Sequence, residues 1–442
     1  MKNHNALNAE TSTLLSSTQL FDFAKKGVYS NTKGSQHIPM AFFDVAQYQI
    51  QQSFPLHTIE RKTLTCDSIQ VSGFHVTNPQ GKLAAFVVLN TSASIKEKVL
   101  FKVALYVVLN HMMGTVPVKC FALYINNQFT LQSKESLFNV ENVSLRLLPV
   151  FPMVLNAVKN IKNVTASEDV TDKTTTADIL PSPFNKKLKQ FLAATPDIEI
   201  SNVSEDLLND LQKRVKSAHV SGKTYFDKKG IYNKLVELCD MTKPLYFLDF
   251  ETAQFVVPEF KSSRPYEQTA FQYSLHRYYS GRLTHVEFLE MNTDPRLALA
   301  TQLINDLGNE GAILTYNVGF ERKVIKTLAE QFPQLSTKLL AIVDRLVDLL
   351  PLMKKFYYNP SQKGSWSLKH TLPAIMGYNP YAELDGTSNG SDAASLYHKV
   401  RSGVVDSKQA HLDLSAYCML DTMGLYEIVQ FILESQITAK AA

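Results

Sequence analysis

Two carboxylates, Asp249 and Glu251, stand two residues apart in the segment YFLDFET. The aromatic and aliphatic run that begins after Pro244 has the length and composition of a β-strand. Side chains two apart on a strand point to the same face, so both carboxylates would converge near the end of that strand. Hard oxygen ligands at this spacing suit Mg²⁺ or Mn²⁺, although such a pair by itself is more often a solvated strand end.

A second acidic motif follows the apolar run GAILTY, which has the pattern of a buried strand. This run leads directly into NVGFE and thereby brings the Asn317 amide and the Glu321 carboxylate to the start of the next helix. An ordinary helix start explains the same two residues equally well, because Asn is a good N-cap and Glu favours the positive end of the helix dipole.

A tyrosine and a third acidic motif lie near the C-terminus, in LDLSAYCMLDTMGLYEIVQFI, which has the pattern of one helix. Tyr417 and Asp421 are four residues apart and would therefore be neighbours on one helix face. Tyr and Asp at this spacing are also common on solvated faces, so this motif has little weight by itself.

The elements between these motifs must bring them together. TAFQYSLHRYY and THVEFLEM predict two strands around the turn Ser280-Gly281-Arg282. DPRLALATQLINDLG then predicts an amphipathic helix that Asp294 and Pro295 open. With the strands before and after, the predicted order is strand, strand, strand, helix, strand, helix. This order is typical of an α/β domain with a ribonuclease H-like mixed sheet flanked by helices.

Taken jointly and in this order, the three motifs resemble the DEDD exonuclease superfamily, whose motifs are DxE, then NxxF followed by an acid, then an acid preceded by His or Tyr. Tyr417 stands four residues before Asp421, whereas Ala416 stands five before it. The resemblance is therefore to the tyrosine subtype, similar to ribonuclease D and polymerase proofreading domains. The sequence departs from the pattern at Glu321, where the superfamily usually has Asp.

The resemblance implies a nuclease, a metal-dependent 3′→5′ exonuclease that hydrolyses phosphodiester bonds at single-stranded RNA or DNA ends with two Mg²⁺ or Mn²⁺ ions. It implies that Asp249 is the bridging metal ligand and that Tyr417 orients the attacking water. The further metal ligands that it implies are Glu251, Glu321 and Asp421. The substrate contacts that we expect around this site are Asn317, Lys369, Arg264 and Phe250, although an aromatic residue such as Phe250 is more often part of the core.

Two further segments match these exonucleases, namely RLVDLLPL, which contains Asp348, and the helix start SLK at residues 367–369. A surface charge is the simpler explanation for each of them. His276, His285 and His370 lack the spacing of the superfamily, so we interpret them as ordinary surface or core histidines.

The chain as a whole resembles a bacterial family of unknown function, DUF2779, through FLDFET, RPYEQTAFQYS, YNVGFE, GSWSLKHTLP, the segment 385–397 and YCMLDT. In that family a restriction-endonuclease-like module with a D…(D/E)xK metal site usually precedes the exonuclease. Here Val88 and Asn90 stand where the acid and the lysine would be, and the earlier acidic position falls near Phe74. The resemblance therefore implies a smaller, degenerate α/β nuclease domain that is retained for binding or for structure.

Length and composition agree with a folded protein of two domains. A chain of 442 residues is too long for one ordinary core, and its 45% apolar and 19% charged residues are near globular averages. The net charge of +4 does not by itself indicate nucleic-acid binding. Four cysteines without a Cys-x-x-Cys pair argue against a cysteine metal cluster and a disulfide scaffold. No signal peptide or membrane span is expected, so the predicted location is cytoplasmic.

We expect a restriction-endonuclease-like domain, a linker rich in Ser, Thr and Asp, a helical connector and the exonuclease domain. Their expected boundaries are 1–162, 163–183, 184–240 and 241–442. The alternative function is a catalytically weak or inactive nucleic-acid-binding or scaffold protein, in which Glu321 and the eroded N-terminal site are stages of one decline. Acids at all four positions together with Tyr417 favour the enzyme.

Overall fold

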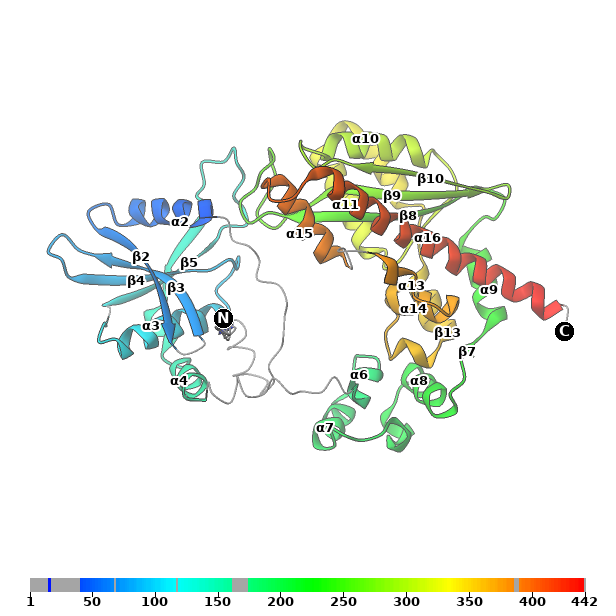
Figure 1. Ribbon diagram of the computed structural model, residues 1–442, viewed down its shortest axis with the longest axis horizontal. Helices are drawn as coiled ribbons and strands as arrows, with labels where there is room; N and C mark the ends of the chain where they lie inside the picture. The colour runs from blue at the N-terminus through cyan, green and yellow to red at the C-terminus, as the bar shows by residue number, and fades with distance from the viewer. Residues whose placement is uncertain are drawn as a thin grey trace, which may run out of the picture. The chain divides into compact units, whose positions relative to one another are not determined.

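The computed structural model of this chain describes residues 15–16, 40–66, 69–116, 118–160, 174–384 and 389–440. Part of the expected linker 163–183 lies outside these described residues, as do residues 385–388 of the segment 385–397. The chain divides into two compact units: the first comprises Met1–Asp172 and Phe255–Glu267, and the second comprises Lys173–Gln254 and Gln268–Ala442. Each unit contains a mixed sheet flanked by helices, as expected for an α/β protein (Figure 1).

The first unit is built on a six-stranded sheet of order β1-β3-β4-β5-β6, with β2 paired to β3. Its strands are β1 (Leu15–Ser16), β2 (Thr58–Cys66), β3 (Ile69–Thr77), β4 (Leu83–Leu89), β5 (Lys119–Ile125) and β6 (Phe138–Asn142). All neighbouring strands are antiparallel except the parallel pairs β1–β3 and β4–β5. Its helices are α2 (Met40–Ser53), α3 (Glu97–Met112), the short 3₁₀ turn η1 (Ser144–Leu147) and α4 (Phe151–Lys159).

The sheet of the first unit has a hydrophobic core on each face, because alternate residues of its strands point to opposite sides. In β4, Phe86 and Val88 pack with α3 and α4, whereas Val87 and Leu89 pack with α2. Val88 is thus a fully buried core side chain, and Asn90 is 4% exposed and donates to the Val88 carbonyl at 2.9 Å. Neither side chain offers a charged metal ligand.

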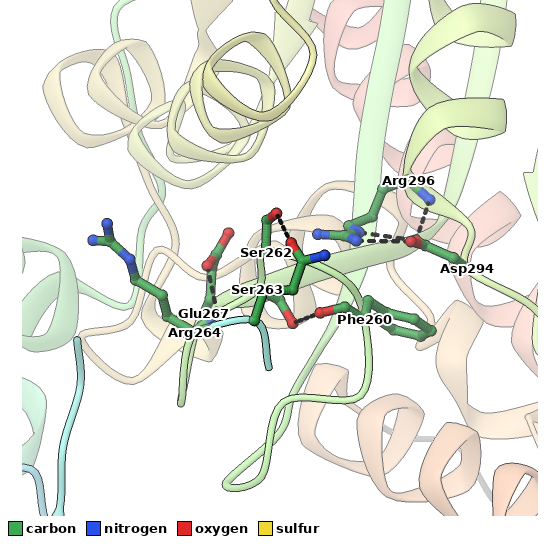
Figure 2. A network of polar contacts seen from close by, with 8 residues as sticks. Phe260, Ser262, Ser263, Arg264, Glu267, Asp294 and Arg296 are labelled. Carbon is green, nitrogen blue, oxygen red and sulfur yellow. Dashed lines mark hydrogen bonds and ion pairs between the residues drawn. The ribbon is translucent and has the colours of Figure 1, made fainter. Parts of the chain in front are cut away.

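The segment Phe255–Glu267 leaves the chain of the second unit directly after β8 and belongs to the first unit by its contacts. Val256 and Val257 pack against the core that contains α2. Arg264 is exposed, and its backbone N–H donates to the Glu267 carboxylate at 2.9 Å (Figure 2). This segment therefore adds a short loop to the first unit, although both of its ends continue into strands of the second.

The second unit is built on a five-stranded sheet of order β10-β9-β8-β11-β12. Its strands are β8 (Leu245–Gln254), β9 (Gln268–Tyr279), β10 (Arg282–Leu289), β11 (Ala312–Thr315) and β12 (Leu346–Asp348). β8, β9 and β10 form an antiparallel meander, whereas β11 runs parallel to both β8 and β12. The predicted order of three strands, a helix, a strand and a helix is confirmed.

Helices cover both faces of this sheet. On one face, α10 (Arg296–Leu307), α11 (Gly319–Gln331) and α12 (Ser336–Val343) pack on Leu248 and Phe250 of β8. On the other face, α9 (Lys228–Leu238), α13 (Leu349–Phe356) and α16 (Ser407–Lys440) pack with Leu245 and Phe247. The long helix α16 contacts both β8 and β9 (Figure 1).

Shorter elements complete the second unit. The expected helical connector contains α7 (Lys186–Ala194), the 3₁₀ turns η3 (Ile200–Asn202) and η4 (Glu205–Leu207), α8 (Asp210–Ser221) and β7 (Tyr225–Phe226), with α6 (Thr176–Ile179) before it and α9 at its end. The other elements are η5 (Pro333–Leu335), β13 (Tyr357–Tyr358), η6 (Pro360–Gln362), α14 (Leu368–Met376), η7 (Pro380–Glu383) and α15 (Gly390–Arg401). None of the described helices combines the length and apolarity that crossing a lipid bilayer requires.

Candidate metal centre

Strand β8 carries the first two acidic residues. Leu248 and Phe250 of this strand point into the core under α10 and α11, so Asp249 and Glu251 point to the opposite face, on which α16 lies. Glu251 is 5% exposed and Asp249 is half-buried. The ladder with β9 has an irregularity between Glu251 and Thr252, at the end of this acidic stretch. Such bulges re-aim side chains, and they are common beside active sites.

Helix α16 brings Tyr417, Cys418 and Asp421 to the same face of β8. The Cys418 thiol is fully buried, and its Sγ lies 3.6 Å from Oδ2 of Asp249. Asp421 is 8% exposed, and burial together with its charge raises the pKa of the Tyr417 hydroxyl. Tyr417, Cys418 and Asp421 fall on one helix face because their spacings are three and four residues.

A polar cluster fixes α16 on β9 behind these residues. The Thr422 hydroxyl lies 2.7 Å from the Ser274 hydroxyl and 2.8 Å from Nδ1 of His276. Ser274 is the cross-strand partner of Asp249 in the β8–β9 ladder. His276 is 2% exposed, and burial lowers its pKa to about 4, which agrees with its interpretation as a core histidine. Thr422 thus helps to hold the neighbouring Asp421 over the sheet.

The fourth acid, Glu321, lies in the first turn of α11 and is 2% exposed. Within the described part of the chain, its Oε2 has no hydrogen-bond partner. The charge of Glu321 raises the pKa of Asp249, which places the two carboxylates close enough to interact. A buried carboxylate oxygen without a donor costs free energy unless another group, such as a cation, satisfies it.

Asn317 and Asp348 shape the turn that leads into α11. Asn317 is exposed and adopts φ 72°, in the left-handed region that Asn tolerates better than most residues. Its backbone N–H donates to Oδ1 of Asp348 at 2.9 Å, and the same oxygen accepts from the N–H of Leu350 at 3.0 Å. Asp348 therefore caps α13 and also fixes the turn that precedes Glu321.

Lys369 and Tyr381 lie beside α16. The Tyr381 hydroxyl donates to Oδ1 of Asp421 at 2.6 Å. The Lys369 Nζ lies 5.0 Å from the ring centroid of Tyr417 and 5.7 Å from that of Tyr381. Its charge lowers the pKa values of both Glu251 and Asp421, so this half-buried lysine faces the acidic residues as expected.

The four carboxylates have raised pKa values, and burial is the first cause for each. Burial and the charges of Asp421, Glu251 and Glu321 hold the pKa of Asp249 well above its usual range. The pKa of Glu251 is raised to about 8 by burial and by the Asp421 charge, and burial raises that of Glu321 to about 8 as well. The pKa of Asp421 is raised by burial and lowered in part by its hydrogen bond from Tyr381.

This donor set fits a divalent cation. Buried anions that repel one another are stabilised when a cation lies between them, and carboxylate oxygens are the ligands that Mg²⁺ and Mn²⁺ prefer. Oε2 of Glu321, which has no hydrogen-bond partner among the described residues, is a further oxygen whose free energy would fall on binding an ion. One donor atom from each of Asp249, Glu251 and Cys418 lies within 4.8 Å of the other two, which is close enough for a shared ion.

Phe250 is not brought to this cluster. It is 3% exposed and packs in the core on the opposite face of the sheet, because it alternates with the two acids along β8. Our expectation that it contacts a substrate is therefore wrong in this structure. Arg264 lies in the loop Phe255–Glu267, which belongs to the first unit by its contacts, so its expected contact with a substrate stays a prediction.

Sequence analysis missed two residues of the cluster, Cys418 and Tyr381. Cys418 had a usable signal, because it precedes Asp421 by three residues and so shares its helix face. Tyr381 had none, since it lies 40 residues from Asp421 in a different element.

A protein-family model described as "Domain of unknown function (DUF2779)" matches residues 246–367. Residues 246–367 are thus similar to this family. This match confirms the predicted resemblance over these residues, which begin in β8 and include Asp249, Glu251 and Glu321. Tyr417 and Asp421 lie beyond the end of the match. Comparisons with curated proteins and with solved structures found no match.

Proposed function

We propose that the second unit is a metal-dependent 3′→5′ exonuclease of the DEDD type, with a ribonuclease H-like fold, that acts on single-stranded ends of RNA or DNA. The observation that carries this proposal is the convergence of Asp249, Glu251 and Asp421, with Tyr417 one helical turn before Asp421 and a buried Glu321 oxygen that has no hydrogen-bond partner among the described residues. These residues come from three motifs that are far apart in the sequence.

The sheet supports the same proposal. Three antiparallel strands are followed by two parallel ones, so that the first strand of the domain, β8, is central. The motifs lead us to expect such an order, so it supports the proposed ribonuclease H-like fold. In this arrangement β8 and the start of α11, which follows the neighbouring strand β11, bring Asp249 and Glu321 within range of each other.

Phosphodiester hydrolysis needs an activated water and a neutralised leaving oxygen. Two divalent cations held by Asp249, Glu251, Glu321 and Asp421 would supply both, because bound cations acidify water and stabilise developing negative charge. The residues of the chain supply the orientation. The Tyr417 hydroxyl has its pKa raised by burial and by the charges of Asp421 and Glu251, so it stays protonated at neutral pH. It therefore orients the attacking water by hydrogen bonding and does not deprotonate it.

Two further residues support this geometry. Tyr381 donates to Oδ1 of Asp421 and so fixes the orientation of that carboxylate. Lys369, which interacts with Glu251 and Asp421, is the cation that we assign to a phosphate of the substrate. An incoming phosphate would add the negative charge that this lysine favours.

The test is incubation of the purified protein with 5′-end-labelled single-stranded RNA and DNA in Mg²⁺, Mn²⁺ or EDTA. We expect a ladder of products that shorten from the 3′ end in Mg²⁺ or Mn²⁺ and no cleavage in EDTA. Asp249→Asn should lower the rate about a thousand-fold or more, roughly 4 kcal/mol of barrier, because it removes the proposed bridging ligand. Glu237→Gln, on the exposed side of α9, is the matched control.

Cleavage that persists in EDTA, or an Asp249→Asn rate within about tenfold of wild type, would refute the proposed site. The second candidate is a nucleic-acid-binding protein without hydrolysis. The first unit favours this second candidate, because its Val88 and Asn90 are uncharged and cannot replace the acid and lysine of a nuclease site. Val88 is part of the core, and the Asn90 side chain is hydrogen-bonded to the backbone. Binding of the labelled strands without cleavage in either metal would support this candidate.

A further inference from the structure

The acidic cluster contains a thiol that a site for Mg²⁺ alone does not need. Cys418 is fully buried, and its Sγ lies 3.6 Å from Oδ2 of Asp249. Burial and the charges of Asp249, Glu251 and Asp421 hold the pKa of this thiol well above its usual range. Elsewhere in the second unit, the buried Cys239 packs in the hydrophobic core, as isolated buried cysteines usually do.

The geometry suits a shared cation. One donor atom from each of Asp249, Glu251 and Cys418 lies within 4.8 Å of the other two. Three protein donors of mixed oxygen and sulfur type are sufficient for Zn²⁺, which accepts Cys and carboxylate ligands in tetrahedral sites. Mg²⁺ and Ca²⁺, in contrast, take oxygen ligands.

A separate observation also points to a ligand at this place. Oε2 of Glu321 has no hydrogen-bond partner among the described residues, and the side chain is 2% exposed. Glu321 acts on the same Asp249 that contacts Cys418. Glu321 therefore provides, within range of the Asp249 charge, a buried oxygen whose desolvation is not offset by any hydrogen bond that the structure describes.

We propose that Cys418 is a thiolate ligand through which the acidic cluster binds a thiophilic divalent cation of the zinc class, together with Asp249 and Glu251. This inference deepens the proposed function and rests on its metal site, since such an ion would compete with Mg²⁺ or Mn²⁺ for the same carboxylates. On binding, the S–H bond breaks, sulfur keeps the electron pair and donates it to the cation, and the proton passes to solvent. Nothing is oxidised or reduced.

The selectivity follows from ligand softness. A site with oxygen ligands alone already binds Zn²⁺ more tightly than Mn²⁺, in the general order of affinities for divalent ions. A thiolate increases this preference, because sulfur binds Zn²⁺ far better than it binds Mg²⁺ or Mn²⁺. Loss of the sulfur should therefore lower the affinity for Zn²⁺ much more than the affinity for Mn²⁺. A thiol that only donates a hydrogen bond to Asp249 would give no such difference.

The first experiment uses Co²⁺, which replaces Zn²⁺ and gives an intense near-ultraviolet sulfur-to-metal absorption band when a thiolate binds it. Full-length protein is titrated with Co²⁺ and, separately, with Zn²⁺ and Mn²⁺ by calorimetry. We expect the band in wild type and in Cys239→Ser, and its loss in Cys418→Ser and Cys418→Ala. Cys239 is the matched control because it is a buried cysteine of the same unit, 2% exposed.

For Zn²⁺ we expect Cys418→Ser to weaken binding about 10- to 100-fold, whereas Mn²⁺ binding should change less than about threefold. Far-ultraviolet circular dichroism verifies that each variant is folded. Wild-type protein that binds Co²⁺ without a sulfur band overturns the inference whether or not the variants fold. Equal Zn²⁺ affinity in wild type and a folded Cys418 variant overturns it as well.

These outcomes are distinguishable from failure of the proposed function. Suppose that wild type shows the sulfur band and Cys418→Ser selectively loses Zn²⁺ binding, but RNA and DNA are not hydrolysed in Mn²⁺. This result would refute the proposed nuclease activity and support Cys418 as a thiolate ligand. Mn²⁺-dependent hydrolysis without a sulfur band would do the reverse. Asp249→Asn should lose both Mn²⁺ and Zn²⁺ binding, because its carboxylate belongs to both ligand sets.

Discussion

We predict that Glu251→Gln stabilises the metal-free second unit at alkaline pH and removes the stabilisation that divalent cations give it. Glu251 is 5% exposed, and burial together with the Asp421 charge raises its pKa to about 8. Gln has nearly the same shape and no charge, so the substitution removes repulsion and preserves packing. It also removes one of the proposed metal ligands.

The magnitude follows from the pKa. Because the pKa of Glu251 rises from 4.5 to about 8 on folding, the folded state binds more protons than the unfolded state between these pH values. The free energy of unfolding therefore falls as pH rises through this window, and it stays at the lower level above pH 8. Ionisation of Glu251 in the folded state lowers the free energy of unfolding by roughly 5 kcal/mol at high pH and by roughly 3 kcal/mol at pH 7. The buried amide of Glu251→Gln has a desolvation cost of its own, which offsets part of this difference. We therefore expect the free energy of unfolding of Glu251→Gln to exceed that of wild type by about 2–4 kcal/mol at pH 8.

The assay uses the single tryptophan of the chain, Trp366, which is 4% exposed in the core of the second unit. Its fluorescence reports the unfolding of this unit by urea, measured at pH 5 and pH 8, in EDTA and in Mn²⁺. In EDTA, the difference between Glu251→Gln and wild type should be small at pH 5 and large at pH 8. Mn²⁺ at about 100 times its dissociation constant should stabilise wild type by about 2.7 kcal/mol and Glu251→Gln far less. The exposed Glu237→Gln should resemble wild type throughout.

The comparison between the variant and wild type isolates Glu251 from the other acids, which titrate in both proteins. A Glu251→Gln variant that is no more stable than wild type in EDTA at pH 8 would show that repulsion at this site is absent. If the variant keeps the full stabilisation by Mn²⁺, Glu251 is not a metal ligand.

Two further predictions concern the tyrosines on Asp421. Tyr417→Phe keeps the ring beside Asp421 and removes only the hydroxyl, so kcat for labelled oligonucleotides should fall about 10- to 100-fold with KM nearly unchanged. An effect confined to KM would instead assign Tyr417 to substrate binding. Tyr381→Phe removes the 2.6 Å hydrogen bond to Oδ1 of Asp421, so calorimetry should show Mn²⁺ affinity lowered about tenfold. Unchanged affinity would mean that Asp421 keeps its orientation without Tyr381.

The sequence predicted the elements that carry the acids because their patterns are local. The strand before Asp249, the hairpin that follows it and the helix with Asp421 are confirmed as β8, β9, β10 and α16. The alternation that sets Asp249 and Glu251 on one face follows directly from strand geometry. The helix predicted over residues 294–308 is confirmed as α10, although Pro295 and not Asp294 is its N-cap; Oδ1 of Asp294 accepts from the Arg296 N–H at 3.2 Å (Figure 2).

Other features depend on contacts that no local pattern encodes. Phe250 was expected near the site as an aromatic that could stack on a terminal base, yet its position between the two acids sends it to the opposite face. The loop Phe255–Glu267, which contains Arg264, belongs to the first unit although strands of the second unit precede and follow it. Tyr381 reaches Asp421 only because η7 packs on α16. Composition and periodicity contain no information on such pairings.

The hydrogen bonds of the carboxylates argue for an ion at Glu321. Asp421 accepts from the Tyr381 hydroxyl, and Asp249 accepts from the Cys418 thiol. Glu321 has only its own backbone N–H as a hydrogen bond that lowers its pKa, and its Oε2 has no partner in the described part of the chain. The position at which the sequence departs from the DEDD pattern thus has a buried oxygen that no described protein donor satisfies. Its extra methylene gives the carboxylate more reach, so we infer that Glu321 depends more on a bound cation than Asp249 and Asp421 do.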